Sequence, residues 1–204
     1  MSFETATLTV TEAAEARRSV RAFTPEPVPE ADLREILRVA GLAPSAFNVQ
    51  PWRWIVVREP ELKAQLGAAA YGQKQVTGAP AVIVLYSDMA DALERIEETV
   101  HPGMASRRDE VAKSLRGTWA AHTEADRESW GAGQSYIALG YLLLAAQSMG
   151  YATSPMLGFD AAEVKRVLGL PEHVTIPALV AIGVADEEGF PHHRHALDRV
   201  ATFK

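Results

Sequence analysis

Short apolar runs and longer amphipathic stretches alternate along this chain. The segments WRWIVVRE (52–59) and APAVIVLYSD (79–88) are rich in β-branched and aromatic residues, which predicts strands, and TIPALVAIGVAD (175–186) predicts a third. Because the run 79–88 is apolar throughout, we expect that strand to be covered on both faces of its sheet.

Helical spacing dominates the segments between the predicted strands. Shorter helices are predicted at 12–18, around Leu33, Ile36, Leu37 and Ala40, and at 60–70 and 160–170. Strands separated by helices predict an α+β fold, a sandwich with the sheet in the middle.

The longest predicted helix runs from Ala125 to Met149 and is closed by Gly150, a residue type common just after helix C-termini. Between Ile137 and Ala146 it is apolar on every side, so it has to be covered all round. Either a central position in the core or a subunit interface would cover it.

The composition is that of a globular protein and excludes several function classes. The 204 residues are 48% hydrophobic and 23% charged, with a net charge of −6 and no clustered basic face, so no nucleic-acid partner is expected. The absence of cysteine excludes disulfides, thiol catalysis and iron–sulfur clusters. No secretory signal is evident, and the longest apolar run, 136–146, is too short to span a bilayer. We therefore expect a soluble cytoplasmic protein without a membrane partner.

No repeat or flexible linker divides the chain, so we expect one domain over 1–204. Residues 89–123 are polar and mostly helical in pattern, and we expect a variable insertion at the mouth of a pocket, with Trp119 and His122 as lining candidates. Residues 187–204 are expected to form a C-terminal arm. Its histidines, in PHHRH, could bind a metal, but a solvated arm is favoured because no carboxylate accompanies them, so no metal is predicted.

Three segments are candidates for ligand binding. The first, ARRSVRAF, holds Arg17, Arg18, Ser19 and Arg21 at the end of a predicted helix. Guanidinium groups and a hydroxyl suit phosphate oxygens. The alternative is a solvated basic face at a helix C-terminus, where cations are stabilised by the helix dipole.

The second segment, LAPSAFNVQPWRW, places amides beside rigid prolines. Asn48 and Gln50 each offer donors and an acceptor that could bind the edge of a planar heterocycle. Pro44 and Pro51 stiffen the backbone around them, and Ser45 is a turn or cap candidate. An ordered loop whose amides bind neighbouring backbone is an equally good interpretation.

The third segment, YATSPMLGFD, contains a Pro-x-x-Gly turn between a strand and a helix. Such a turn can leave backbone N–H groups free to point at a ligand. A plain turn whose following helix is capped by Asp160 is the simpler interpretation.

Taken in order, RRSVRAF, APSAFNVQPWRW, GQSYIALGYLLLAAQSMGYATSPMLGFD and the arginine of HHRHALDRV resemble the nitroreductase family of FMN-dependent oxidoreductases. The resemblance implies an α/β/α sandwich with a central, mostly antiparallel sheet. It also implies an intertwined homodimer with two tightly bound FMN molecules at the interface, each held by both subunits. The dimer would cover the long apolar helix on both sides.

The resemblance also implies roles for individual residues. Arg17, Arg18, Ser19 and Arg21 would hold the flavin phosphate and pyrimidine side, with Arg21 as the cation near N1 and O2 and Arg194 as a second phosphate ligand. The other subunit would contribute Pro44, Ser45, Asn48 and Gln134, with Gln50 a weaker candidate. The turn beside the reactive N5 edge would be formed by Pro155, Met156, Leu157 and Gly158. Gln75 would be a further flavin contact.

The activity implied is oxidation of NADH or NADPH by hydride transfer to flavin N5, followed by ping-pong reduction of a nitroaromatic or quinone acceptor. No side chain is expected to act as an acid or base. Leu157, His192 and Gln75 replace an acidic residue and two lysines of some members, which leaves the acceptor open. A specialised flavoenzyme, for metabolite dehydrogenation or reductive dehalogenation, and a non-catalytic flavin-binding protein are the alternatives.

Overall fold

A computed structural model describes residues 7–204, and its centre is a four-stranded sheet. The strands are β1 (Trp52–Val57), β2 (Ala81–Ser87), β3 (Ala152–Met156) and β4 (Thr175–Gly183). Their spatial order is β1-β2-β4-β3, and each neighbouring pair is antiparallel. The three predicted strands are therefore present, each a little shorter than its apolar run.

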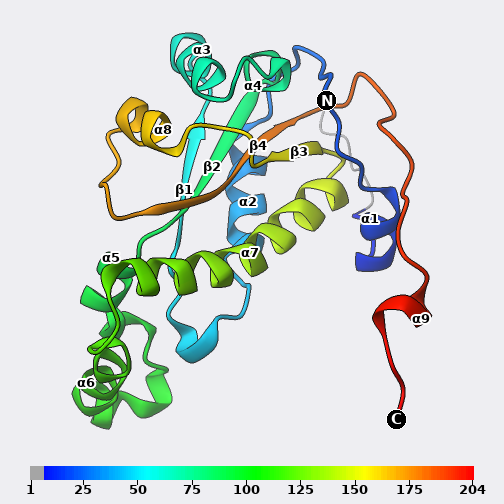
Figure 1. Cartoon of the computed structure of the whole chain (residues 1–204). Coiled ribbons are helices and arrows are strands. Elements are labelled where there is room, and N and C mark those ends of the chain that lie inside the picture. The colour runs from blue at the N-terminus through cyan, green and yellow to red at the C-terminus, as the bar shows by residue number, and fades with distance from the viewer. Residues whose placement is uncertain (1–6) are drawn as a thin grey trace.

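Helices cover both faces of the sheet (Figure 1). The α-helices of the described residues are α1 (Val10–Ala16), α2 (Glu30–Ala40), α3 (Pro60–Ala69), α4 (Lys74–Gly78), α5 (Met89–Glu94), α6 (Arg108–Trp119), α7 (Glu124–Ser148), α8 (Ala161–Leu168) and α9 (Leu197–Val200). Short 3₁₀ segments are η1 (Ala46–Asn48), η2 (Ile96–Thr99) and η3 (Pro102–Arg107). None of the helices within residues 7–204 is long and apolar enough to cross a membrane.

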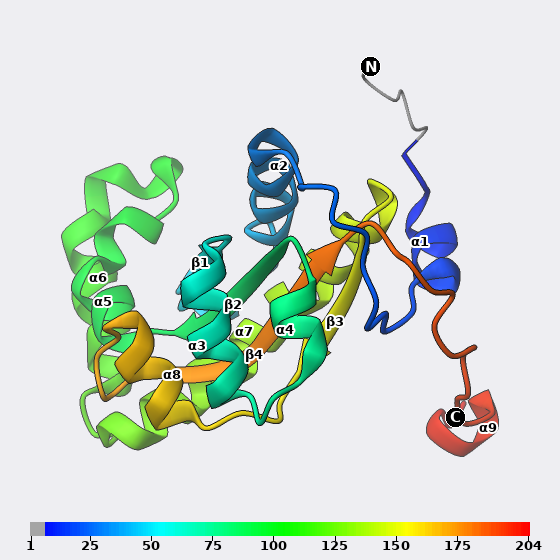
Figure 2. The ribbon, with the colours of Figure 1, turned by 90° about the horizontal axis from the view of Figure 1, so that it is seen from above.

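Alternation along the strands divides the core into two layers. Ile83 and Leu85 of β2 point to the face covered by α2 and α7. Val82 and Val84 point to the face covered by α3, α4 and α8, which lie side by side in Figure 2. This arrangement confirms the predicted α/β/α sandwich with an antiparallel sheet.

Helix α7 is buried on one side only. A capping box between Thr123 and Asp126 starts it, and Gly150, with φ of 85°, follows its C-cap. Leu142 belongs to the core, whereas the Tyr136 side chain is 46% exposed, and Ile137 and Tyr141 are similarly open. A single chain therefore leaves part of this apolar helix uncovered.

Residues 89–123 form a small subdomain with its own apolar cluster. Met89, Ile96 and Trp119 are its buried centre, together with Val49 from the loop before β1. This subdomain therefore packs directly on the second candidate segment.

The first helix ends earlier than the sequence pattern suggested. Thr9 caps it through a reciprocal bond with Glu12, and Arg17 leaves the helix with φ −58° and ψ 130°. Arg18, Ser19 and Arg21 consequently lie on an extended strand-like segment beyond the helix rather than at its last turn.

Candidate functional site

Two distant parts of the chain form a basic pocket. Arg17, Arg18, Ser19 and Arg21 line a cavity of about 170 Å³ together with Phe190, Pro191, His192 and Arg194 of the C-terminal arm. His192 Nε2 lies 3.2 Å from the carbonyl oxygen of Ala14, which attaches the arm to α1. The structure thus brings the predicted second arginine to the first cluster.

The guanidinium groups of the four pocket arginines have no carboxylate partner within residues 7–204, although the backbone N–H of Arg21 donates to Glu187 Oε1 at 2.6 Å. None of their guanidinium groups forms a salt bridge with a carboxylate of residues 7–204. Arg18 donates to the carbonyl oxygen of Glu15 at 2.6 Å, and Arg194 donates to that of His193 at 2.8 Å. Burial, together with the nearby charges of Arg194 and Arg18, lowers the pKa of Arg17. Uncompensated guanidinium groups around one cavity are suited to binding an anion.

The basic pocket is connected to β3 and the turn that follows it. Ser19 pairs with Thr153 in an isolated parallel bridge, and the Val20 N–H donates to the Thr153 carbonyl at 3.1 Å. Beyond Thr153 the chain continues through Pro155 and the buried Met156 to the turn. The basic pocket and the predicted Pro-x-x-Gly turn are therefore attached to the same strand.

The turn after β3 is exposed and anchored from one side. The Leu157 side chain is 69% exposed, and the carbonyl oxygen of Gly158 accepts a hydrogen bond of 2.6 Å from Gln73 Nε2. Gln75 is buried and donates to Gln73 Oε1 at 3.1 Å. The sequence pattern pointed to Gln75 but not to Gln73. The two glutamines of GQKQ look alike in the sequence, and only the start of α4 decides which way each side chain points.

The loop ahead of β1 is held by its own polar side chains and by α7. Ser45 Oγ accepts from the Gln50 N–H, and Gln134 Oε1 accepts from the Ala46 N–H, both at 2.9 Å. Asn48 Nδ2 donates to the Thr99 carbonyl at 2.9 Å, and Gln50 Nε2 donates to Asn48 Oδ1 at 3.1 Å. The amides therefore bind neighbouring groups, as the ordered-loop interpretation predicts, and binding of a heterocycle by Asn48 and Gln50 stays a prediction.

The backbone of this loop is strained. Phe47 and Asn48 both have φ of 56°, and Gln50 has φ of 49°, values that non-glycine residues rarely adopt. Each such residue costs about 1–3 kcal/mol and is found mainly where surrounding contacts enforce it, often at functional sites. Here Trp119 packs edge-on against Phe47 with ring centroids 5.7 Å apart.

A cavity of about 410 Å³ opens between this loop and the 89–123 subdomain. The lining residues are mostly apolar: Phe47, Asn48, Thr99, Val100, His101, Met104, Val111 and Leu115. Trp119, expected as a lining residue, is buried beneath Phe47 instead.

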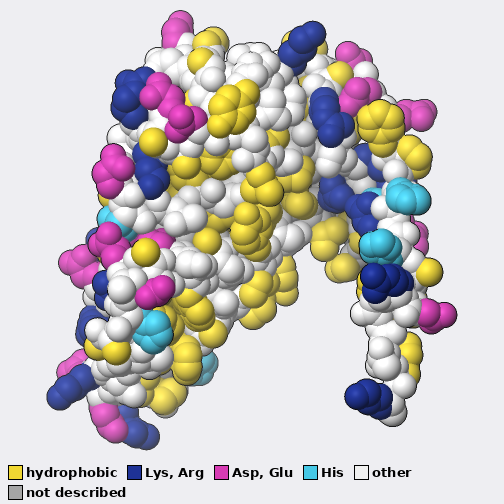
Figure 3. Space-filling model, in the orientation of Figure 1, with side chains coloured by type: hydrophobic (Ala, Val, Ile, Leu, Met, Phe, Trp, Pro, Cys, Tyr) yellow, Lys and Arg dark blue, Asp and Glu magenta, His cyan; other side chains and the backbone are white. Residues whose placement is uncertain are grey.

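One chain leaves the candidate residues in two separate groups. Arg17 and Arg194 lie beside Leu144 of α7, whereas the loop ahead of β1 is attached at Gln134, about 15 Å away along the helix axis. Figure 3 shows a hollow between the arm and the body, bordered by hydrophobic side chains on the body and by basic side chains and histidines on the arm. The exposed face of α7 lies between the two groups.

The sequence profile of the Nitroreductase family matches residues 14–184. This chain belongs to the nitroreductase family. The matched range contains the whole basic segment ARRSVRAF, the loop ahead of β1 and the turn after β3, though not Arg194, so the predicted family is confirmed. The protein is accordingly an oxidoreductase of this family.

Relatives match this chain over almost their whole length. A Thermus thermophilus protein named NADH dehydrogenase is 50% identical over 203 residues, covering 98% of this chain and 99% of the relative. YdgI of Bacillus subtilis, whose name describes an NAD(P)H nitroreductase, is 34% identical and covers 92% of this chain and 94% of its own.

A solved structure extends the similarity to three dimensions. A nitroreductase-type protein of Exiguobacterium sibiricum, crystallised in complex with FMN, superposes with a TM-score of 0.87 at 27% identity, covering 97% of this chain and 98% of that chain. The sandwich described above is therefore the fold of this family.

Proposed function

We propose that this nitroreductase-family protein is an FMN-dependent NAD(P)H oxidoreductase of the cytoplasm. The observation that carries the proposal is the basic pocket, in which four arginines, whose guanidinium groups have no carboxylate partner within residues 7–204, and a serine hydroxyl surround one cavity. A phosphomonoester dianion such as that of FMN matches this charge and these donors. The FMN complex of the Exiguobacterium protein gives the proposal independent support.

The remaining candidate residues fit the other parts of a flavin. Pro155, Met156, Leu157 and Gly158 would lie along its reactive edge, and Arg21 would face the pyrimidine side, where reduced flavin is negatively charged. Gln75 would affect the flavin site indirectly. Its side-chain amide donates to Gln73, and Gln73 in turn donates to the carbonyl oxygen of Gly158 in the turn. Bound FMN would supply reversible two-electron acceptance from a nicotinamide.

The proposal includes a homodimer. The loop carrying Pro44, Ser45 and Asn48 is attached to Gln134 and lies away from the basic pocket of its own chain. A second copy on the exposed face of α7 would bury Tyr136 and Tyr141 and bring its own loop to that pocket. A homodimer would thus assemble complete sites from two half-sites and cover the open side of the helix.

The acceptor side is apolar. The cavity between Phe47 and the 89–123 subdomain offers mainly aliphatic and aromatic contacts, and the exposed Leu157 adds no charge. Flat acceptors such as nitroaromatics and quinones match this surface. Donor and acceptor would use the same open flavin face in turn, which gives ping-pong kinetics.

Absorbance spectroscopy of the purified protein is the direct test. We expect a flavin spectrum with one FMN per chain, bleaching by NADH or NADPH, and recovery on addition of a quinone. A double Arg17→Ala/Arg194→Ala variant should lose at least tenfold in FMN affinity, because two cations leave the phosphate site. Protein that gains no flavin spectrum on addition of FMN would exclude the proposal.

Arg34→Ala is the matched control for those charge changes. Arg34 is an exposed residue of α2 paired with Glu30, and it does not line the pocket. This variant should bind FMN like the unmodified protein, so an equal loss in both variants would indicate a general effect of charge.

A further inference from the structure

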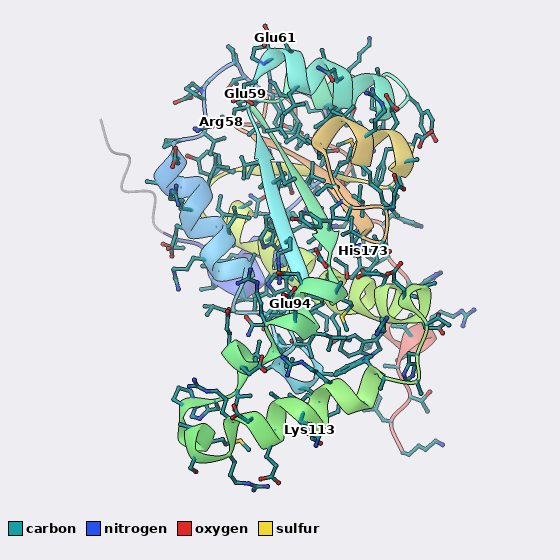
Figure 4. The ribbon with its side chains drawn as sticks, turned by 90° about the vertical axis from the view of Figure 1, so that its left-hand side faces the viewer. Arg58, Glu59, Glu61, Glu94, Lys113 and His173 are labelled. Atoms are coloured by element: carbon teal, nitrogen blue, oxygen red, sulfur yellow. The ribbon has the colours of Figure 1, made fainter. Side chains whose placement is uncertain are left out.

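Asp88, Glu128 and His173 form a cluster outside the basic pocket and the loop ahead of β1. Asp88 ends β2, Glu128 lies in the first turns of α7, and His173 precedes β4. One ligand atom from each of the three lies within 4.8 Å of the others, and Asp88 Oδ1 is 3.1 Å from His173 Nε2. In Figure 4, His173 lies at the end of the sheet, and Glu94 marks the last residue of α5.

Glu128 is the unusual member of the cluster. It is only 3% exposed, and one carboxylate oxygen, Oε1, accepts a hydrogen bond of 2.6 Å from the Met89 N–H. The other oxygen, Oε2, is fully buried, and neither it nor the nearby buried hydroxyl of Ser87 has a hydrogen-bond partner of normal geometry among residues 7–204. A buried carboxylate oxygen without a donor is costly, and a bound cation would remove that cost.

The type and spacing of the donors match a transition-metal site. Imidazole nitrogen and carboxylate oxygen are common Zn²⁺ ligands at about 2.0–2.2 Å, so two ligands on one tetrahedral ion lie about 3.3 Å apart. The Asp88–His173 distance of 3.1 Å is close to that value. His173 and Asp88 keep 23% and 14% of their side chains exposed, which leaves an approach from solvent.

We propose that Asp88, Glu128 and His173 bind one divalent transition-metal ion, with Zn²⁺ the best match, and that water fills a fourth position. The ion would join the end of β2, the start of α7 and the segment before β4. Because α5 begins directly after Asp88, the metal would fix the start of the 89–123 subdomain against α7.

The alternative is that the cluster only stabilises the start of α5. Asp88 Oδ1 caps this helix by accepting from the Asp91 N–H at 2.9 Å, and Glu128 accepts from Met89. That role explains one oxygen of each carboxylate, and His173 Nε2 at hydrogen-bond distance from Asp88 Oδ1 would hold the capping residue, but Glu128 Oε2 is left without a partner among residues 7–204. Metal titration separates the two interpretations.

Isothermal titration calorimetry with Zn²⁺ on the chelator-treated, FMN-saturated protein is the test. We expect one high-affinity ion per chain and a rise of the melting temperature on zinc addition. His173→Ala should weaken zinc binding about tenfold or more, since one of three protein ligands is lost. Asp88→Asn, which retains a helix-capping oxygen, should weaken binding without unfolding α5.

His193→Ala controls for the histidines of the C-terminal arm and should leave zinc affinity unchanged. Circular dichroism and the flavin spectrum verify that each variant is folded, independently of metal and of turnover. The proposal is overturned if the unmodified protein binds no zinc, or if His173→Ala binds it as tightly as the unmodified protein does. These outcomes leave the proposed flavin chemistry unaffected, since FMN binding is measured separately.

Discussion

The side-chain oxygen of Gln134 accepts a hydrogen bond of 2.9 Å from the backbone N–H of Ala46, 88 positions earlier in the chain. This bond attaches the strained loop ahead of β1 to the long helix α7. The loop needs such a partner because Phe47, Asn48 and Gln50 all have positive φ. Gln134 is thus both a proposed flavin ligand and the residue that sets the position of other ligands.

Gln134→Leu should loosen this loop and weaken FMN binding. The substitution removes the acceptor for Ala46, and losing one such bond costs about 1–3 kcal/mol when the donor stays unpaired. We expect about a tenfold rise in the FMN dissociation constant, measured by flavin fluorescence. Gln147→Leu, on the same helix at a side chain without a hydrogen bond to residues 7–204, should change it little. Equal affinity in the Gln134 variant and the unmodified protein would contradict this role.

Trp119→Ala should destabilise the protein by about 3–5 kcal/mol, the usual cost of emptying a buried aromatic site. Trp119 also packs edge-on against Trp130, with centroids 5.0 Å apart, besides supporting Phe47. Urea unfolding measures the loss, and the KM for a quinone should rise because Phe47 lines the proposed acceptor cavity. Trp119→Phe keeps an aromatic contact and should show a smaller loss; similar values for both would argue against ring packing as the cause.

Gly131→Ala should be destabilising although alanine favours helices. A Cβ at this position would lie 2.4 Å from Ser87 Oγ and 2.6 Å from Met89 Cγ, so α7 would have to move away from the end of β2. We expect a loss of about 1–3 kcal/mol in thermal or chemical unfolding. Gly117→Ala, in the exposed part of α6 with no atom within 4 Å of the added carbon, should instead gain about 1 kcal/mol. A gain at both positions would show that α7 adjusts freely.

The ion pair between Arg53 and Asp91 should make stability depend on pH in the acidic range. Hydrogen bonding to Arg53 is the main cause that lowers the pKa of Asp91, with a further contribution from Arg95. A carboxyl whose pKa is lowered in the folded state stabilises the protein above its unfolded pKa, near 3.9, and this contribution is lost as the pH falls through the folded pKa.

Asp91→Asn should therefore be less stable than the unmodified protein by about 1 kcal/mol at pH 7, the size expected for a half-exposed pair. The difference should vanish toward pH 3. Urea unfolding at several pH values measures it, and Glu59→Gln, at an exposed carboxylate outside the ion pairs of residues 7–204, is the control. A difference that persists at pH 3 would assign the effect to packing.

Local patterns were sufficient to predict the strands β1, β2 and β4 and the main helices α2, α3, α7 and α8. The apolar run of β2 and the Asp160 cap of α8 were both predicted correctly, because burial on a strand and capping of a helix depend on near neighbours. Both ends of α1 were predicted two residues too late. The capping box between Thr9 and Glu12 starts the helix at Val10, and Arg17 leaves it with extended backbone angles.

The sequence by itself determined the strands, the main helices, the family and the residue types able to hold a phosphate, since these depend on composition and on short-range order. The tertiary structure decided which of those residues meet. It brought Arg194 to Arg17, assigned the Gly158 contact to Gln73, and placed His173 beside Asp88 and Glu128. Such contacts depend on how layers pack across the sheet, and no local periodicity along the chain encodes that packing.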